Sequence, residues 1–405
     1  MLIRNILTKA VCAALFSLVT TMGASAAGNT QGITPTTIRI GMLGPYSGPD
    51  SVFDPLDYGP TAYLRYINAT GGVHGRKFDI VFADSACNET QGIAAAKKLI
   101  YQDKVFMVMA QPCSGVSLAI KPMLLRSGVP WMGLAADPHI ALPTSPGIFA
   151  VGYTGNASGH AMAAFAMSKP GVKKVALVEH SNDWAHGYCN AATAYVKSHG
   201  GTVVANTTLE PGATDATAQV LRIKASGAQA VMACLYQPAL IVFLRAMHQY
   251  GMHIPVMGAL GADFDQVVHD VGTIDAVKGI FFQPYQFQAP IGQGPLARFH
   301  DIFLKYLTKS ELPANGVPTN FYYFGVPVAI VTVKAFDLAG PNPTRQSWIA
   351  AVESLKHFQT GVFADTETFS VTNHVGVQRM NDVGLNASGK ETIYKSWGTP
   401  IAGPQ

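Results

Sequence analysis

The chain has 405 residues, of which 13% are charged and 48% are hydrophobic, and its formal net charge is +4. So small a positive excess, without basic clusters, argues against nucleic acid as a partner. At roughly 150 residues per domain, the length predicts two domains, each large enough to bury its own hydrophobic core.

The N-terminus has the pattern of a secretory signal peptide. Arg4 and Lys9 accompany a short apolar stretch over residues 10–19, and the Ala-Ser-Ala run at 24–26 supplies the small residues that signal peptidase needs. The stretch is shorter than the ~20 residues that span a bilayer, which argues against a membrane anchor. We therefore expect a cleaved signal peptide over residues 1–26.

A lipoprotein is a further alternative because Cys12 is present. Cys12 lies inside the apolar stretch, however, and follows Lys9, Ala10 and Val11 rather than the small apolar residues of a lipid-attachment site. No later apolar run is both long enough to cross a membrane and free of proline and polar residues. We therefore expect the mature chain to be soluble.

Four cysteines follow the leader, namely Cys87, Cys113, Cys189 and Cys234. An even number in an oxidising compartment permits one or two disulfides, with three possible full pairings. No two of them form a CxxC pair and none has a histidine at metal-ligand spacing. Neither zinc binding nor thiol redox chemistry is therefore expected.

Short apolar runs alternate with segments of helical spacing along the chain. Strands are predicted at 38–43, 78–83, 105–109 and 129–133, with helices at 58–68, 90–101 and 116–126. The pattern restarts with strands at 174–178, 202–209, 230–235 and 255–258 and helices at 187–199, 217–225 and 239–250. Later helices are predicted at 297–306, 322–339 and 346–354, and the chain from Phe363 is strand-like and rich in turns.

This alternation indicates βαβ units, so the predicted fold class is α/β with two doubly wound parallel-sheet lobes. In open sheets of this kind, ligands bind beyond the carboxyl ends of the strands. The loops at these ends are rich in serine, aspartate, glycine and aromatic residues and span 44–57, 84–89, 110–115, 134–140, 180–186, 235–238 and 259–263. Their composition suits a small polar ligand with an apolar part, although the same residue types also cap helices and form turns.

Enzyme motifs are weak. The run Pro-Cys-Ser-Gly around Ser114 is not a GxSxG nucleophile elbow, and residues 384–391 differ from a P-loop because Glu391 replaces the magnesium-binding hydroxyl. The histidines lack the spacing of a helical metal site. Ligand capture is therefore favoured over catalysis, with a serine hydrolase using Ser114 as an alternative. No catalytic residue, metal or cofactor is expected.

Three stretches carry a resemblance to a known family. The first predicted strand runs into Gly-Pro-Tyr-Ser-Gly-Pro at 44–49, and the first helix runs into Tyr-Ile-Asn-Ala-Thr-Gly-Gly-Val-His-Gly-Arg at 66–76. A later stretch, 250–258, reads Tyr-Gly-Met-His-Ile-Pro-Val-Met-Gly. In this order, over nearly the whole mature chain, they resemble the type I periplasmic binding proteins of the branched-chain amino-acid type, which serve ABC importers.

The resemblance implies two lobes joined by a three-strand hinge, which close on the ligand. The crossings are expected near Tyr153, 281–285 and 360–363. Lobe 1 would contain residues 33–152 plus 284–360, and lobe 2 would contain residues 153–283 plus 361–405.

The resemblance also implies a ligand site between the lobes. Ser114 matches the hydroxyl that binds the ligand carboxylate, and Ala135 and Asp137 match the next loop, with Asp137 in place of a hydroxyl residue. A buried carboxylate needs such hydrogen-bond donors because an unpaired buried charge is costly. A disulfide between Cys87 and Cys113, directly before Ser114, is implied as well.

Four aromatic residues match positions around the ligand in this family. Phe53 falls in the first loop, Trp184 and Tyr236 fall on the second lobe, and Tyr285 lies near the second crossing. Aromatic residues are also common in cores, but the shared location of these four near strand ends favours a role in the site.

Leu260 occupies the position of the amine-binding glutamate of the family. A ligand ammonium there would lack its counter-charge, and an unpaired buried cation costs several kcal/mol. Either Asp137 or Asp263 supplies the missing charge, or the ligand is an aliphatic or aromatic acid without an amine.

The sequence therefore predicts a periplasmic solute-binding subunit of an ABC importer, which captures a small carboxylate-bearing ligand. The expected partners are this ligand and an inner-membrane ABC permease, and the chain is expected to be a monomer. A ligand-sensing module for a membrane receptor would use the same site and is the alternative from another class.

Overall fold

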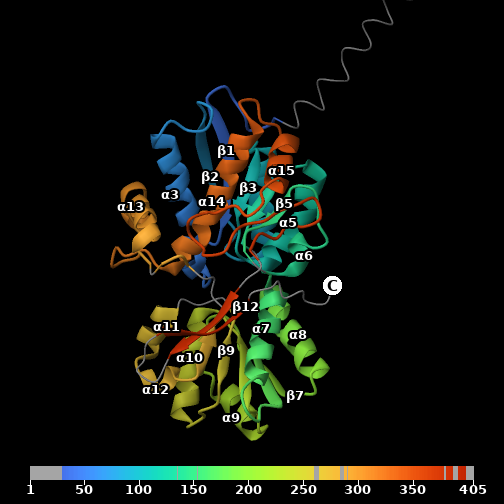
Figure 1. The fold of residues 1–405 in the computed structure, drawn as a ribbon, viewed down its shortest axis with the longest axis vertical. Coiled ribbons are helices and arrows are strands. Elements are labelled where there is room, and N and C mark those ends of the chain that lie inside the picture. Colours follow the sequence, from blue (N-terminus) through green and yellow to red (C-terminus); the bar gives the residue numbers. More distant parts are fainter. Residues whose placement is uncertain are drawn as a thin grey trace, which may run out of the picture.

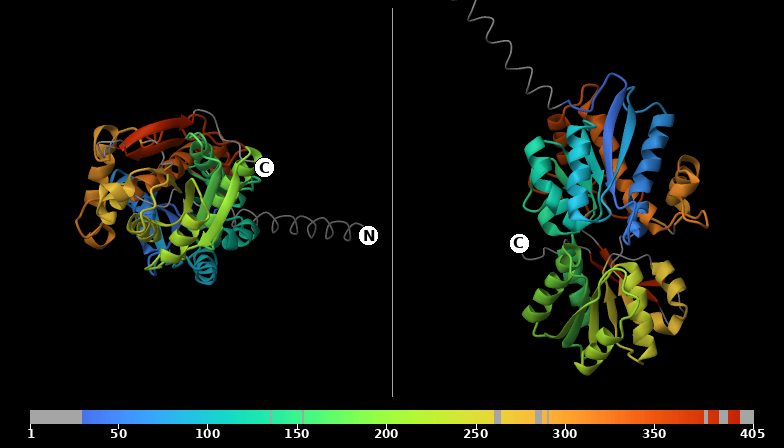
Figure 2. Two further views of the ribbon diagram at one scale, coloured as in Figure 1. Left: turned by 90° about the horizontal axis from the view of Figure 1, so that it is seen from below. Right: turned by 180° about the vertical axis from the view of Figure 1, so that it is seen from behind.

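The computed structural model describes residues 30–134, 136–152, 154–259, 264–282, 287–289, 291–377, 380–385 and 391–397. Within these residues the chain forms two α/β lobes that lie end to end along the long axis of the molecule (Figure 1). The same two lobes are seen from below and from behind in Figure 2. The predicted signal peptide and the predicted crossing at Tyr153 lie outside the described residues.

The first lobe is built on a five-stranded parallel sheet in the order β2-β1-β3-β4-β5. Its strands are β1 (Thr37–Gly44), β2 (Lys77–Asp84), β3 (Met107–Ala110), β4 (Trp131–Gly133) and β5 (Ile148–Ala150). The connecting elements are the 3-10 turn η1 (Ser51–Phe53) and helices α3 (Pro55–Ala69), α4 (Glu89–Tyr101), α5 (Ser114–Ser127) and α6 (Pro138–Ala141).

The second lobe is built on a seven-stranded sheet in the order β12-β11-β10-β9-β8-β6-β7. In this sheet β11 runs antiparallel to both of its neighbours, β10 and β12. Its strands are β6 (Lys174–Glu179), β7 (Thr202–Thr208), β8 (Ala230–Cys234), β9 (Val256–Gly258), β10 (Ile280–Phe282), β11 (Met380–Leu385) and β12 (Glu391–Trp397). Its helices are α7 (Gly155–Met167), α8 (Asp183–Ser198), α9 (Thr217–Ala225), α10 (Gln237–Gln249), α11 (Phe264–Val271) and α12 (Ile274–Val277).

After β10 the chain returns to the first lobe before β11 rejoins the second sheet. The returning elements are η2 (Gly294–Leu296), α13 (Ala297–Tyr306), η3 (Lys309–Glu311), α14 (Asn320–Ala339) and α15 (Arg345–Glu353). The three predicted C-terminal helices are thus confirmed to within two residues.

Both faces of each sheet are covered by helices, as the near-continuous apolar strands indicate. Along β6, Val175 and Leu177 belong to the core that contains α7 and α8, whereas Ala176 and Val178 belong to the core that contains α9 and α10. Successive side chains of a strand point to opposite faces, so this alternation buries four consecutive apolar residues without exposing any.

The sequence did not predict α7. Its residues Ala161, Met162, Ala163, Phe165 and Ala166 are all buried, so the helix has no wide polar face. A helix that is apolar on most sides lacks the 3.6-residue periodicity on which recognition from sequence depends.

Residues 364–377 lie against the first lobe, which differs from the predicted start of the second lobe at residue 361. Val375 pairs with Ala150 of β5, and the ring of Phe369 lies 5.9 Å from that of Phe149. Phe369 is fully buried in the first-lobe core, and burial of this large side chain accounts for the location of the segment. The chain joins the second sheet only at Met380.

Helix α14 packs along α3 through two glycines. A Cβ on Gly59 would lie 2.1 Å from the carbonyl oxygen of Tyr322, and one on Gly325 would lie 2.0 Å from that of Leu56. Among the described helices, α14 is the one long and apolar enough to span a membrane, but 78% of its apolar window is buried inside the protein. It is therefore a core helix of the first lobe, and its close approach to α3 brings the N-terminal ends of both helices together.

Two disulfides hold the loops at the carboxyl ends of the strands. The expected Cys87–Cys113 bridge is present with a Cα–Cα distance of 5.6 Å. Cys189 and Cys234, whose pairing the sequence left open, form a second bridge with a Cα–Cα distance of 6.2 Å. The first bridge precedes Ser114 and the second ties α8 to the end of β8, two residues before Tyr236.

We predict that the double variant Cys189→Ala, Cys234→Ala loses about 4 kcal/mol of unfolding free energy, because the bridge closes a 45-residue loop in the unfolded chain. Urea unfolding measures the loss, and Cys87→Ala, Cys113→Ala is the matched comparison, with a loss of about 3.5 kcal/mol for its 26-residue loop. Thiol labelling of denatured, unreduced protein should modify none of these four cysteines. Labelling of Cys189 or Cys234 would contradict the second bridge.

Candidate ligand-binding site

Aromatic side chains from both lobes meet in one row. The ring of Phe53, from η1 of the first lobe, lies 4.9 Å from that of Tyr236 in the second lobe, and Tyr236 lies 4.6 Å from Trp184. Phe321, at the start of α14, lies 5.6 Å from Phe53 on the other side. The structure therefore brings together three of the predicted site residues and adds Phe321, which the sequence did not single out.

Hydrogen bonds to the buried imidazole of His180 hold Tyr236 in place. The backbone N–H of Tyr236 donates to Nε2 of His180 at 2.8 Å, and Nδ1 of His180 lies 2.5 Å from the carbonyl oxygen of Leu209. These partners require a neutral ring with its proton on Nδ1. Burial lowers the pKa of His180, which keeps the ring in this neutral form.

Asn182 links the two aromatic residues of the second lobe. Its Oδ1 accepts the backbone N–H of Ala185 and so caps α8, which begins at Asp183, four residues before the predicted start. Its Nδ2 donates to the hydroxyl of Tyr236 at 3.3 Å. Trp184 therefore lies in the first turn of a helix rather than in a loop, and burial raises the pKa of Tyr236 so that its phenol stays neutral.

Ser114 and Asp137 are hydrogen-bonded to each other in the first lobe. The backbone N–H of Asp137 donates to Oγ of Ser114 at 3.2 Å. Oδ1 of Asp137 accepts from the backbone N–H of His139 at 2.8 Å and lies 2.9 Å from its Nδ1, so the carboxylate caps α6. Ser114 is the first residue of α5 rather than its N-cap, which is Cys113.

The second lobe packs directly against Ala136 and Asp137, in the loop between β4 and α6. The backbone N–H of Gly155 in α7 donates to the carbonyl oxygen of Ala136 at 2.6 Å. A Cβ on Gly187 in α8 would lie 3.7 Å from Cα of Asp137. Ala136 also belongs to the same buried cluster as Phe53 and Trp184. The lobes thus touch at the loop between β4 and α6, which is hydrogen-bonded to Ser114, as well as along the aromatic row.

Four further predicted site residues, Ala135, Leu260, Asp263 and Tyr285, lie outside the described residues. Their part in the site stays a prediction. Among the residues that the structure describes, no group of three or more histidine, cysteine, aspartate or glutamate side chains could hold a metal ion.

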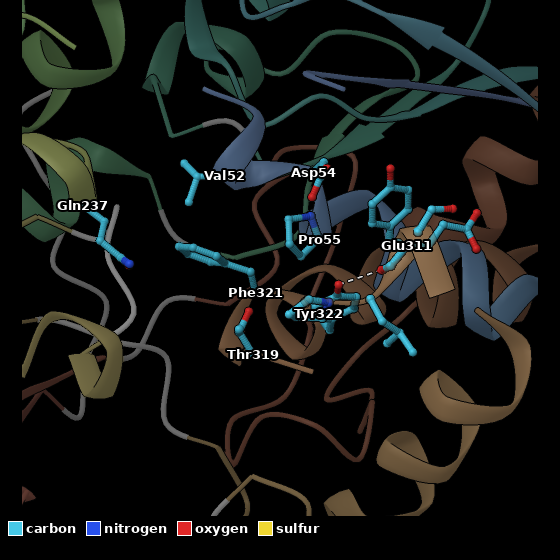
Figure 3. A pocket seen from close by; sticks show the side chains of 12 residues that line it. Val52, Asp54, Pro55, Gln237, Glu311, Thr319, Phe321 and Tyr322 are labelled. Atoms are coloured by element: carbon cyan, nitrogen blue, oxygen red, sulfur yellow. Dashed lines mark hydrogen bonds between the residues drawn. The ribbon is translucent and has the colours of Figure 1, made fainter. Parts of the chain in front are cut away.

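A cavity of about 330 Å³ lies beside Phe321, at the end of the aromatic row (Figure 3). It is lined by Val52, Asp54, Pro55, Tyr58, Gln237, Ser310, Glu311, Leu312, Pro313, Thr319, Phe321 and Tyr322. Gln237 comes from the second lobe and every other lining residue comes from the first. Four of these residues lie in the predicted ligand-binding loops 44–57 and 235–238, but none was predicted individually, because the cavity forms only where the starts of α3 and α14 meet.

Acidic groups dominate the loop between β1 and α3 and the first turn of α3. Burial raises the pKa of Asp50, and it raises the pKa of Asp54, which lines the cavity, to about 6. Burial also raises the pKa of Asp57, whose Oδ2 accepts the hydroxyl of Tyr46 at 2.7 Å. Within the described residues, no lysine, arginine or histidine pairs with any of these three acids.

Glu311, the second acid at the cavity, is neutralised by Arg65. Two hydrogen bonds of 2.6 and 2.9 Å join the guanidinium to the carboxylate, and the backbone N–H of Thr308 donates to it as well. Burial acts to raise the pKa of Glu311, but these bonds outweigh burial and lower it. The unbalanced charge of the cavity therefore belongs to Asp54.

A family model described as periplasmic binding protein matches residues 37–390. The chain belongs to the periplasmic binding protein family. Leu/Ile/Val-binding protein homolog 3 of Brucella melitensis is 27% identical over 338 residues, which cover 83% of this chain and 88% of that protein. An amino acid binding protein of Pseudomonas aeruginosa is 27% identical over 245 residues, which cover 60% of this chain and 66% of that protein.

Solved structures share the fold at low sequence identity. A branched-chain amino acid ABC transporter protein from Thermus thermophilus with bound valine has a TM-score of 0.82 at 18% identity, covering 91% of this chain and 98% of that one. A fatty acid ABC transporter substrate-binding protein from Thermomonospora curvata has a TM-score of 0.78 at 17% identity, covering 92% and 95%. The predicted two-lobed α/β class is thus confirmed.

We predict that Asp54→Asn stabilises the ligand-free protein at pH 8. The folded protein holds the Asp54 proton up to a pKa of about 6, whereas the unfolded chain releases it near 3.8. The unfolding free energy therefore falls as the pH rises through this range, and the full loss is present above pH 6. The gain in melting temperature should shrink between pH 6 and pH 4 and vanish below that.

Asp275→Asn is the matched control because Asp275 is exposed and pairs with Lys278 at 2.6 Å. A hydrogen bond from Lys278 lowers its pKa, so this variant should gain nothing at pH 8. An equal gain in both variants, or one that does not change with pH, would contradict the burial of Asp54.

Proposed function

We propose that this protein is the periplasmic solute-binding subunit of an ABC importer and captures a small carboxylate-bearing ligand between its two lobes. The observation that carries the proposal is that the aromatic row joins Trp184 and Tyr236 of the second lobe to Phe53 of the first. Such a row gives an apolar ligand body contact with both lobes, so binding favours the closed arrangement.

The carboxylate of the ligand would bind at the start of α5. Oγ of Ser114 accepts the backbone N–H of Asp137, which leaves the hydroxyl proton of Ser114 to be donated to a ligand oxygen. The N-terminal end of α5 adds unpaired backbone N–H groups and a partial positive charge. Asp137 is engaged in capping α6, so it helps to shape this loop.

Membership of the family supports export to the periplasm and a permease as partner. The relatives named above include proteins described as binding leucine, isoleucine and valine, and the solved structures include one described as a fatty acid binder. Both kinds of ligand join a carboxylate to an apolar body. We therefore propose this class, an amino acid or an aliphatic or aromatic acid, as the cargo.

A thermal-shift screen of amino acids beside amine-free aliphatic and aromatic acids tests the proposal. A ligand at 100 times its Kd should add about 2.7 kcal/mol of stability, which gives a clear shift in melting temperature. Stabilisation without turnover is the expected result. Turnover of ester substrates that disappears in Ser114→Ala would instead support the hydrolase alternative.

We predict that Trp184→Ala weakens binding of the ligand found by the screen by 10- to 100-fold, or about 1.4–2.7 kcal/mol, because aromatic anchors dominate binding energy. Trp184→Phe is the matched control and should keep most of the affinity, since it retains a ring against Tyr236. Isothermal titration calorimetry measures both. Equal affinity in the alanine variant and the native protein would remove Trp184 from the site.

A further inference from the structure

We propose that the cavity at the starts of α3 and α14 is a subsite for an ammonium group of the ligand, with the carboxylate of Asp54 as its counter-charge. This assignment rests on the proposed function and deepens it. The ligand would then be a zwitterion, and Asp54 of the first lobe would replace the acid that the family resemblance implies at the position of Leu260.

The location of the cavity makes it part of the ligand cleft. Phe321 belongs both to its lining and to the aromatic row, where its ring lies 5.6 Å from that of Phe53. Val52 and Gln237 line the cavity, and they directly precede Phe53 and follow Tyr236 in the sequence (Figure 3). A ligand whose body contacts the aromatic row can therefore extend a polar group into this cavity.

The charge of the lining favours a cation. Asp54 stands at the N-cap position of α3, but its side chain makes no capping hydrogen bond. Among the lining residues that the structure describes there is no lysine, arginine or histidine, and the carboxylate of Glu311 is already held by Arg65. A ligand ammonium would convert the unpaired, partly buried carboxylate of Asp54 into an ion pair.

A second, independent feature is an unused hydroxyl. Thr319 occupies the N-cap position of α14 without capping it, and in the described structure its Oγ1 is buried with no hydrogen-bond partner. Buried polar atoms of folded proteins are nearly always paired, so this oxygen is suited to accept an N–H from a bound group. It is one of the groups that line the same cavity as Asp54.

The aromatic residues of the cavity suit the same ligand group. Burial and then the charge of Asp54 raise the pKa of Tyr58 to about 12, and both also raise the pKa of Tyr322, so the carboxylate acts on two lining phenols. Aromatic faces attract ammonium groups. The starts of α3, α10 and α14 each carry a partial positive charge of about one half, and Asp54, the N-cap residue of α3, offsets part of this with a full negative charge.

Titration calorimetry at pH 8 with n-hexylammonium, its neutral analogue 1-hexanol, and hexanoate tests the subsite. We expect n-hexylammonium to bind the native protein at least tenfold more tightly than 1-hexanol does. Asp54→Asn should remove this preference, and Thr319→Val should reduce it. The matched control Asp275→Asn, remote from the cavity and exposed, should retain it.

Equal affinity for n-hexylammonium in Asp54→Asn and the native protein would overturn the assignment, as would no binding to the native protein. A loss of hexanoate affinity in Asp54→Asn as large as the loss for n-hexylammonium would overturn it too, because the substitution would then have damaged the cleft rather than removed a counter-charge. Failure of the proposed function is seen separately. In that case no carboxylate ligand would show an affinity that depends on Trp184, whatever the result with n-hexylammonium.

Discussion

The ring contact between Phe53 and Tyr236 is the interaction on which the binding arrangement depends, because it joins the two lobes where their aromatic side chains meet. Both residues are only 6% exposed, so separating the lobes would return two aromatic rings to water. Burying one such side chain is worth about 1.5–3 kcal/mol. A ligand that fills the cleft can replace part of this contact, and the free energy of closure and the free energy of binding are then linked.

Each lobe has structural features that hold its aromatic residue of this contact in place. In the second lobe, the Cys189–Cys234 bridge and His180 fix α8 and the end of β8, from which Trp184 and Tyr236 project. In the first lobe, Gly59 and Gly325 allow α3 and α14 to approach closely, which brings η1 and the start of α14 together. A site assembled from such supports can keep its geometry while the lobes move as bodies.

The sequence predicted the parts of the fold that have local patterns. Alternating apolar runs and helical spacing identified most βαβ units, and resemblance identified Phe53, Trp184 and Tyr236, which the structure brings together. It did not predict α7, which lacks a polar face, or the location of the segment around Phe369. The cavity was also missed. Asp54 precedes Pro55 and Thr319 follows Pro318, and each pair has the local pattern of a helix start. The two residues come together only because Gly59 and Gly325, 266 residues apart, allow α3 and α14 to pack closely.

The central claim is that the two lobes close on a ligand through the aromatic row. Spin labels at Lys97→Cys in α4 and Lys197→Cys in α8, both exposed, report the distance between the lobes by double electron–electron resonance. With a saturating carboxylate ligand that raises the melting temperature, the distance distribution should shorten and narrow, and Tyr236→Ala should lose much of this response. An identical distribution with and without the bound ligand would contradict the account.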